Sequence, residues 1–79
     1  MRNIIKTQQK IKVYMFDLLA GLGHGYLLDT NEKVYLNGLN VITPNVYMGM
    51  LPDEIITADI ELMDDGDLFA RNIERDIKR

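Results

Sequence analysis

The sequence predicts a small all-β protein in which five short strands close into a barrel. β-Branched and aromatic residues gather in five runs of four to nine residues, a composition typical of strands. Glycine, asparagine and aspartate stand between these runs, where turns are expected. Closing five strands into a barrel removes exposed sheet edges, and a chain of 79 residues is long enough for one such domain.

The first half of the chain predicts three strands. IKVYMF (11–16) is rich in β-branched and aromatic residues and forms the first strand. The glycines of LLAGLG (18–23) end it, because glycine adopts turn conformations that other residues avoid. GYLL (25–28) and KVYL (33–36) form a hairpin around the polar loop DTNE, and the NG pair at 37–38 marks the next turn.

The second half predicts a long loop, two further strands and a tight turn. Residues 39–52 contain both prolines and are interpreted as a loop with a short strand near 39–42. Apolar and polar residues alternate along 55–63, which makes this the clearest strand, and DDGD (64–67) is a tight turn. The inward face of the strand is predicted to comprise Ile56, Ala58, Ile60 and Leu62, opposite Thr57, Asp59 and Glu61.

The last segment fits two structures. LFARNI (68–73) can pair as the fifth strand, whereas Phe69, Ile73 and Ile77 also fit one face of a short C-terminal amphipathic helix. The strand is favoured for 68–73, and a helical tail after it stays open. The chain is then one domain, 1–79, with a basic N-terminal extension (1–10), a barrel (11–74) and a basic tail (75–79).

Residue types exclude several kinds of site. The chain has no cysteine, no serine and one histidine, which excludes disulfides and thiolate ligands and disfavours zinc. The acidic turn 64–67 lacks the ligand spacing of a calcium loop and is predicted to be solvated. No apolar run approaches the roughly 20 residues that span a bilayer. We expect a cytoplasmic protein that is not an enzyme, with no cofactor, metal or membrane partner.

Charge is unevenly distributed around a net value of −3. Residues 1–12 hold four cations and no acid, and residues 71–79 hold four cations and two acids. Residues 13–70 hold ten acids and one cation, Lys33. The basic ends are either ordinary solvated surface or a basic edge that touches phosphate where the termini meet.

Four stretches, taken in order, carry a resemblance to a known family. They are KVYMFD (12–17), LGHGYL (22–27), VYLN (34–37) and FARNI (69–73). Their order resembles the Lys-Val-x-Trp-Phe-Asn, Lys-Gly-Phe-Gly-Phe-Ile, Val-Phe-Val-His and Gln-Ala-x-Asn-Val motifs of the cold-shock domain. That family is a five-stranded OB-fold barrel that binds single-stranded nucleic acid. Here the family's tryptophan, lysine, phenylalanine and histidine are replaced by Met15, Leu22, His24 and Asn37.

The resemblance implies a face for single-stranded RNA or DNA on the second and third strands. Alternate residues of a strand share a face, so His24 and Tyr26 point the same way, and so do Tyr35 and Asn37. Bases that lie flat on such rings bind with little sequence preference. The nucleic-acid-binding residues implied are Lys12, Phe16, His24, Tyr26, Tyr35, Asn37, Tyr47 and Arg71.

Structural and functional alternatives stay open. The tyrosines and Phe16 also fit half-buried barrel positions, and His24 fits an ordinary surface histidine. The acidic body, Met15 and Leu22 favour a second hypothesis, a protein-interaction module such as a virus-encoded inhibitor or adaptor that meets a basic partner. The methionine-rich stretch 46–51 fits either a self-association surface or a cap on the barrel, so monomer and homodimer both remain open.

Overall fold

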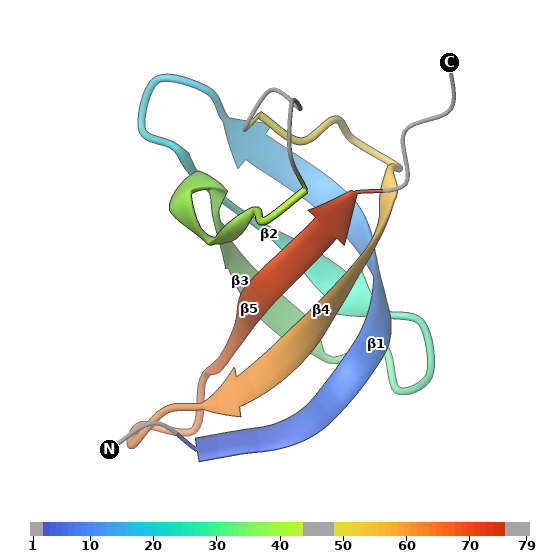
Figure 1. The fold of residues 1–79 in the computed structure, drawn as a ribbon, viewed down its shortest axis with the longest axis vertical. Coiled ribbons are helices and arrows are strands. Elements are labelled where there is room, and N and C mark those ends of the chain that lie inside the picture. Colours follow the sequence, from blue (N-terminus) through green and yellow to red (C-terminus); the bar gives the residue numbers. More distant parts are fainter. Residues whose placement is uncertain (1–2, 44–48, 76–79) are drawn as a thin grey trace.

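The computed structural model describes residues 3–43 and 49–75 and confirms an all-β protein (Figure 1). These residues form five strands and one short 3-10 helix, with no α-helix among them. The elements are β1 (Asn3–Asp17), β2 (Leu22–Leu27), β3 (Lys33–Asn37), the 3-10 helix η1 (Gly38–Asn40), β4 (Ile55–Leu62) and β5 (Leu68–Arg75).

The strands close into a barrel in the order β1-β2-β3-β5-β4. Neighbouring strands are antiparallel, except that β3 and β5 run parallel, with Val34 opposite Leu68 and Tyr35 opposite Phe69. A small closed barrel of five strands is consistent with an OB-like fold. Closure gives each strand two neighbours, so the described sheet has few free edges.

The first strand is much longer than the sequence predicts. β1 begins at Asn3, pairs with β4 along residues 3–12 and with β2 along residues 11–17, and so bends around the barrel (Figure 1). Residues 3–10 therefore belong to the barrel and do not form an extension. This part of β1 could not be predicted from the sequence, because none of its side chains is buried and it therefore shows no apolar alternation.

The carboxylate of Asp59 on β4 ties together two bends of the sheet. Gln8 in β1 and Asn72 in β5 both have left-handed backbone, with φ of 54° and 50°, and both lie at register shifts. Asp59 Oδ1 accepts a hydrogen bond from the Gln8 backbone N–H at 3.2 Å, and Oδ2 accepts one from Asn72 Nδ2 at 2.8 Å. Such bulges let a short sheet curve enough to close.

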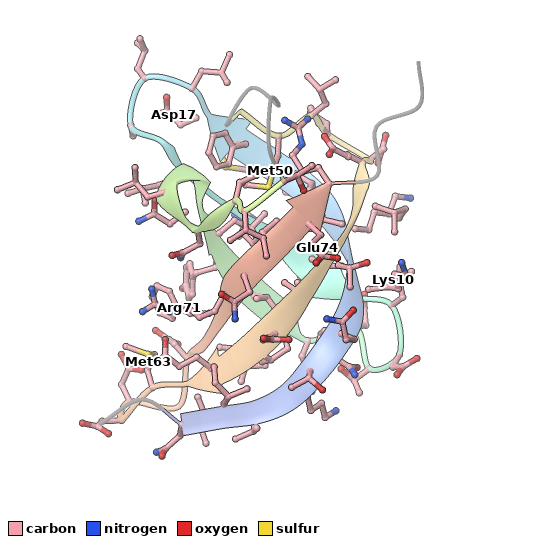
Figure 2. The ribbon with its side chains drawn as sticks, in the orientation of Figure 1. Lys10, Asp17, Met50, Met63, Arg71 and Glu74 are labelled. Atoms are coloured by element: carbon pink, nitrogen blue, oxygen red, sulfur yellow. The ribbon has the colours of Figure 1, made fainter. Side chains whose placement is uncertain are left out.

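The core consists of inward side chains from all five strands and Met50. Met50, labelled in Figure 2, is 2% exposed, which favours the cap interpretation for the described part of 46–51. Gly25 lies against β1, because a Cβ there would overlap the Lys12 carbonyl oxygen. The core residues are Ile11, Val13, Leu27, Val34, Leu36, Met50, Ile56, Ala58, Ile60, Leu68, Ala70 and Ile73.

β4 follows the predicted alternation except at its end. Its first three predicted inward residues are buried, but Leu62 is 37% exposed because it pairs with the first residues of β1 and β5 at the barrel rim. Glu61, predicted to face solvent, is only 2% exposed. Its Oε1 accepts a hydrogen bond from Arg71 Nε at 2.5 Å. The arginine compensates the cost of burying this carboxylate.

The segment after β3 is helical where the sequence predicts a short strand. Asn37 caps η1, and its side-chain oxygen accepts a hydrogen bond from the Leu39 backbone N–H at 2.9 Å. Val41 then makes a single parallel bridge to Ile73. The prediction of a strand near 39–42 is wrong because a local capping bond competes with strand pairing.

The last segment is a strand, as favoured, and the helical alternative is wrong for residues 68–75. Phe69 is half-buried, whereas Ile73 is fully buried. The left-handed residue Asn72 lies between them and shifts the inward set from Leu68 and Ala70 to Ile73. The helix-like spacing of Phe69 and Ile73 therefore comes from a bulge.

Candidate nucleic-acid interface

The outer surface of β2 and β3 carries aromatic side chains. His24 and Tyr35 lie directly opposite each other in the antiparallel register. The next residues along, Gly25 and Val34, are buried, so His24 and Tyr35 point outward. Tyr26 lies two residues after His24 and shares its face. All three rings are half-buried, which leaves surface on which a ligand can lie.

A bulge in β1 brings Tyr14 to the same surface. Val13 pairs with Gly25 and Met15 pairs with His24, so Tyr14 between them has no partner in the register. Tyr14 is 64% exposed. Its ring centroid lies 5.2 Å from that of His24, at an interplanar angle of 30°, and 5.9 Å from that of Tyr26, nearly perpendicular at 82°.

On the other side of His24 the aromatic surface continues onto β5. The ring centroids of Tyr35 and Phe69 are 5.3 Å apart, at an angle of 33°. Lys33 Nζ lies 4.9 Å from the centroid of Tyr35, within cation–π distance. We call this surface the ring face. It crosses four strands and comprises Tyr14, His24, Tyr26, Tyr35 and Phe69.

The structure brings together the three rings predicted from the sequence and adds two. Tyr14 occupies the variable position of the first motif, yet it directly follows the inward residue Val13, and this alternation is the signal that could have identified it. In the resemblance, Phe69 is only the first residue of the last motif, FARNI (69–73). Its pairing with Tyr35 depends on the parallel contact between β3 and β5, which local sequence does not encode.

Two other predicted residues do not join the ring face, and a third lies outside the described residues. Phe16 pairs with Gly23 and packs against the core, on the opposite side of β1 and β2 from His24. The side chain of Asn37 caps η1. Tyr47 lies outside the described residues, so its predicted role stays a prediction.

The two predicted cations already have acidic partners. Lys12 Nζ lies 3.7 Å from Asp53 Oδ1, in a pair that is largely exposed. Arg71 projects from β5 (Figure 2), contacts Glu61 and donates to Asn40 Oδ1 at 3.3 Å. Arg71 is therefore a fixed structural cation, whereas Lys12 and Lys33 are exposed residues, and both pair in register with Tyr26.

An apolar groove lies at the end of the barrel where the β1–β2 turn meets η1, and no residue of the ring face lines it. It has a volume of about 400 Å³, and its walls come from the β1–β2 turn and η1. Leu18, Leu19, Leu22 and Leu39 around it are 57%, 100%, 52% and 80% exposed. We call this the leucine groove. Contiguous exposed apolar surface of this kind is typical of contact sites.

The acidic turn between β4 and β5 is closed by its own hydrogen bonds. Asp65 Oδ1 accepts a hydrogen bond from the Asp67 N–H at 3.0 Å, and Gly66 adopts a φ of 91°. Within residues 3–43 and 49–75, no three His, Asp or Glu side chains gather to share a metal ion. The same ranges contain no helix of the length and apolarity needed to cross a membrane.

A comparison with protein-family models finds none that matches this chain, and a comparison with curated proteins finds no significant match.

Proposed function

We propose that this protein binds single-stranded RNA or DNA, with bases stacked on the ring face. The observation that carries the proposal is the row Tyr14, His24, Tyr35 and Phe69, one ring from each of four adjacent strands. Ring contacts join Tyr14 to His24 and Tyr35 to Phe69, and His24 lies opposite Tyr35 in the register. Aromatic rings accept any base, and each stacked base contributes about 1–3 kcal/mol. A row of this length supports binding through several bases without sequence readout.

The charges beside the ring face support the same proposal to a lesser degree. Lys33 lies over Tyr35 and Lys12 lies beside Tyr26, so two ammonium groups can follow the phosphate backbone of a stacked strand. The acids of the body limit any longer-range attraction. Affinity is therefore expected to come from stacking more than from charge.

Strand order and ring positions support a distant relation to the cold-shock domain. His24, Tyr26 and Tyr35 occupy the aromatic positions of the two motifs quoted above and share one face of an OB-like barrel. The proposal is one of binding without catalysis. His24 packs within 6 Å of the rings of Tyr14 and Tyr26, an environment that suits stacking better than proton transfer.

Fluorescence anisotropy with labelled seven-nucleotide DNA and RNA strands at low salt tests the proposal. We expect dissociation constants below about 100 µM, the weak end for non-specific contacts, and several-fold weaker binding by Tyr35→Ala. Leu19→Ala is the matched control, because Leu19 is fully exposed and lies away from the rings. Absence of binding by the unchanged protein at this concentration would contradict the proposal.

The leucine groove favours a second candidate function, the binding of a basic protein segment. Its leucines lie on a body in which acids outnumber bases, so an amphipathic basic peptide would match both the apolar surface and the charge. Titration with such a peptide, with Leu19→Asp as the variant, tests this candidate. Binding that is unaffected by Leu19→Asp would exclude the groove.

A further inference from the structure

A cavity lies beside the ring face, at the point where β1 and β2 approach the loop before β4. Its volume of about 250 Å³ is below the range of roughly 300–1,000 Å³ typical of drug-sized ligands, so it fits one planar base. Tyr14 and Tyr26 line it together with Val13, Leu27 and Leu28. Its polar lining comes from Lys12, Asn31 and Asp53. We call this the base pocket.

Two residues of the base pocket are held in left-handed backbone conformations. Asn31 has a φ of 63° and Asp53 a φ of 68°. Backbone hydrogen bonds hold both residues, since the Asn31 N–H donates to the Leu27 carbonyl and the Asp53 N–H donates to the Val13 carbonyl, each at 2.8 Å. Asparagine and aspartate adopt left-handed backbone more readily than other non-glycine residues. The two side chains are therefore positioned by fixed backbone.

Lys12 and Asp53 present a donor and an acceptor side by side. Lys12 Nζ and Asp53 Oδ1 are 3.7 Å apart, longer than the roughly 2.7–3.2 Å of a hydrogen bond. Their side chains are 54% and 84% exposed, so both groups remain able to bind a ligand. Lys12 also pairs in register with Tyr26, which places its ammonium group next to a stacking surface.

We infer that the base pocket selects guanine from the strand that the ring face holds. This inference rests on the proposed function. The two adjacent donors of guanine, N1–H and the N2 amino group, would donate to the two carboxylate oxygens of Asp53. The neighbouring O6 would accept from Lys12 Nζ. A bidentate, charge-assisted pair of this kind is stronger and more specific than a single hydrogen bond.

The other bases do not match this pair of groups. Adenine and cytosine each present one amino group beside a ring-nitrogen acceptor, so one oxygen of Asp53 would face a lone pair. Uracil and thymine present one N–H between two carbonyl acceptors, with the same result. Each of these bases would therefore make one hydrogen bond to Asp53 where guanine makes two, and a bidentate charge-assisted pair binds more strongly than a single bond. Only guanine offers Asp53 two adjacent donors and Lys12 an acceptor at the same time.

The test uses heptathymidine DNA strands in which only the central base is changed to guanine, adenine or cytosine. We expect the guanine strand to bind about tenfold more tightly than the other three, as for one well-made base contact. Asp53→Asn should abolish this preference, so that the guanine strand binds it no more tightly than heptathymidine does, and asparagine tolerates the left-handed backbone of residue 53. Asp29→Asn is the control, with the same loss of charge on an exposed residue that does not line the pocket.

Lys12→Ala provides a second variant, which removes the donor to O6 and should also reduce the preference. Equal affinity for all four strands would overturn the guanine inference and leave the proposed function standing. Preference for another base, or a guanine preference that survives Asp53→Asn, would overturn it too. Failure of every strand to bind would overturn both proposals. Thermal melting of each variant confirms that it is folded.

Discussion

Tyr14 packs on His24 across β1 and β2, with ring centroids 5.2 Å apart. Tyr14 faces outward because it follows the inward residue Val13, and it lies at the bulge of β1 opposite His24 and Gly25. This contact extends the aromatic row from two strands onto a third. Since Tyr14 is 64% exposed, its ring contributes more free surface to the row than the half-buried rings of β2 and β3.

Replacement of Tyr14 is therefore expected to affect binding more than stability. Tyr14→Ala removes about one base stack, which corresponds to roughly 1–3 kcal/mol of binding free energy. Strand affinity, measured by anisotropy, should fall about fivefold or more, while the melting temperature changes little. A large loss of stability with unchanged affinity would show that the ring is structural.

Salt dependence separates stacking from phosphate contact. Heptathymidine contains no guanine for Lys12, so Lys12 and Lys33 beside the ring face can neutralise about two of its phosphates. The logarithm of the binding constant should then fall with the logarithm of salt concentration with a slope of about −1.4 for a single strand. Titrations at several salt concentrations measure this slope. A slope several times steeper would show that the nucleic acid contacts basic residues other than Lys12 and Lys33.

Arg71 is expected to matter for stability more than for binding. Arg71→Met leaves the Glu61 carboxylate, 2% exposed, without its arginine, and loss of one partner of a buried pair costs about 3 kcal/mol. Urea unfolding should show this loss. The double variant Glu61→Leu, Arg71→Met should recover most of it, because no buried charge remains. If the double variant did not regain the free energy of unfolding, Arg71 would be shown to act through contacts other than Glu61.

Gln8 provides a test of backbone strain. Its left-handed conformation costs a non-glycine residue about 1–2 kcal/mol. Gln8→Gly keeps the backbone N–H that binds Asp59 and should raise the free energy of unfolding by about 0.5–1 kcal/mol, after the entropy cost of glycine. Asn72→Gly is the comparison and should not stabilise, because it also removes the side-chain bond to Asp59. Urea unfolding measures both, and equal gains would contradict this account.

The pair between Glu54 and Arg75 predicts how stability depends on pH. Burial alone raises the pKa of Glu54. Hydrogen bonds from Arg75 and the Leu51 N–H, with the charge of Arg75, outweigh burial and lower the pKa below its ordinary value.

A lowered pKa means that the folded state holds fewer protons on Glu54 than the unfolded state. Its contribution to stability is therefore complete above the ordinary pKa of a glutamate and is lost as pH falls through the lowered value. The free energy of unfolding, measured from about pH 7 to pH 3, should fall less on acidification for Glu54→Gln than for the unchanged protein. If the free energy of unfolding fell equally with pH in both proteins, this role of Glu54 would be contradicted.

Apolar alternation explains which parts of the fold could be predicted. β4 and the β2–β3 hairpin carry their pattern in consecutive residues, and the structure has both. Residues 3–10 of β1 bury no side chain, so only their pairing with β4 makes them a strand. The same holds for the candidate site. His24, Tyr26 and Tyr35 could be predicted from alternation, whereas Phe69 could not, because it joins the site through a contact between distant segments.

The sequence by itself determined the all-β class, the hairpin and the outward direction of its rings, because a side-chain period of two depends only on neighbouring residues. Tertiary structure alone decided that the ring of Tyr14 meets that of His24, that Phe69 extends the row, that Phe16 belongs beside the core, and that Asp53 meets Lys12. Those relationships depend on a bulge and on barrel closure, which bring together residues far apart in the chain.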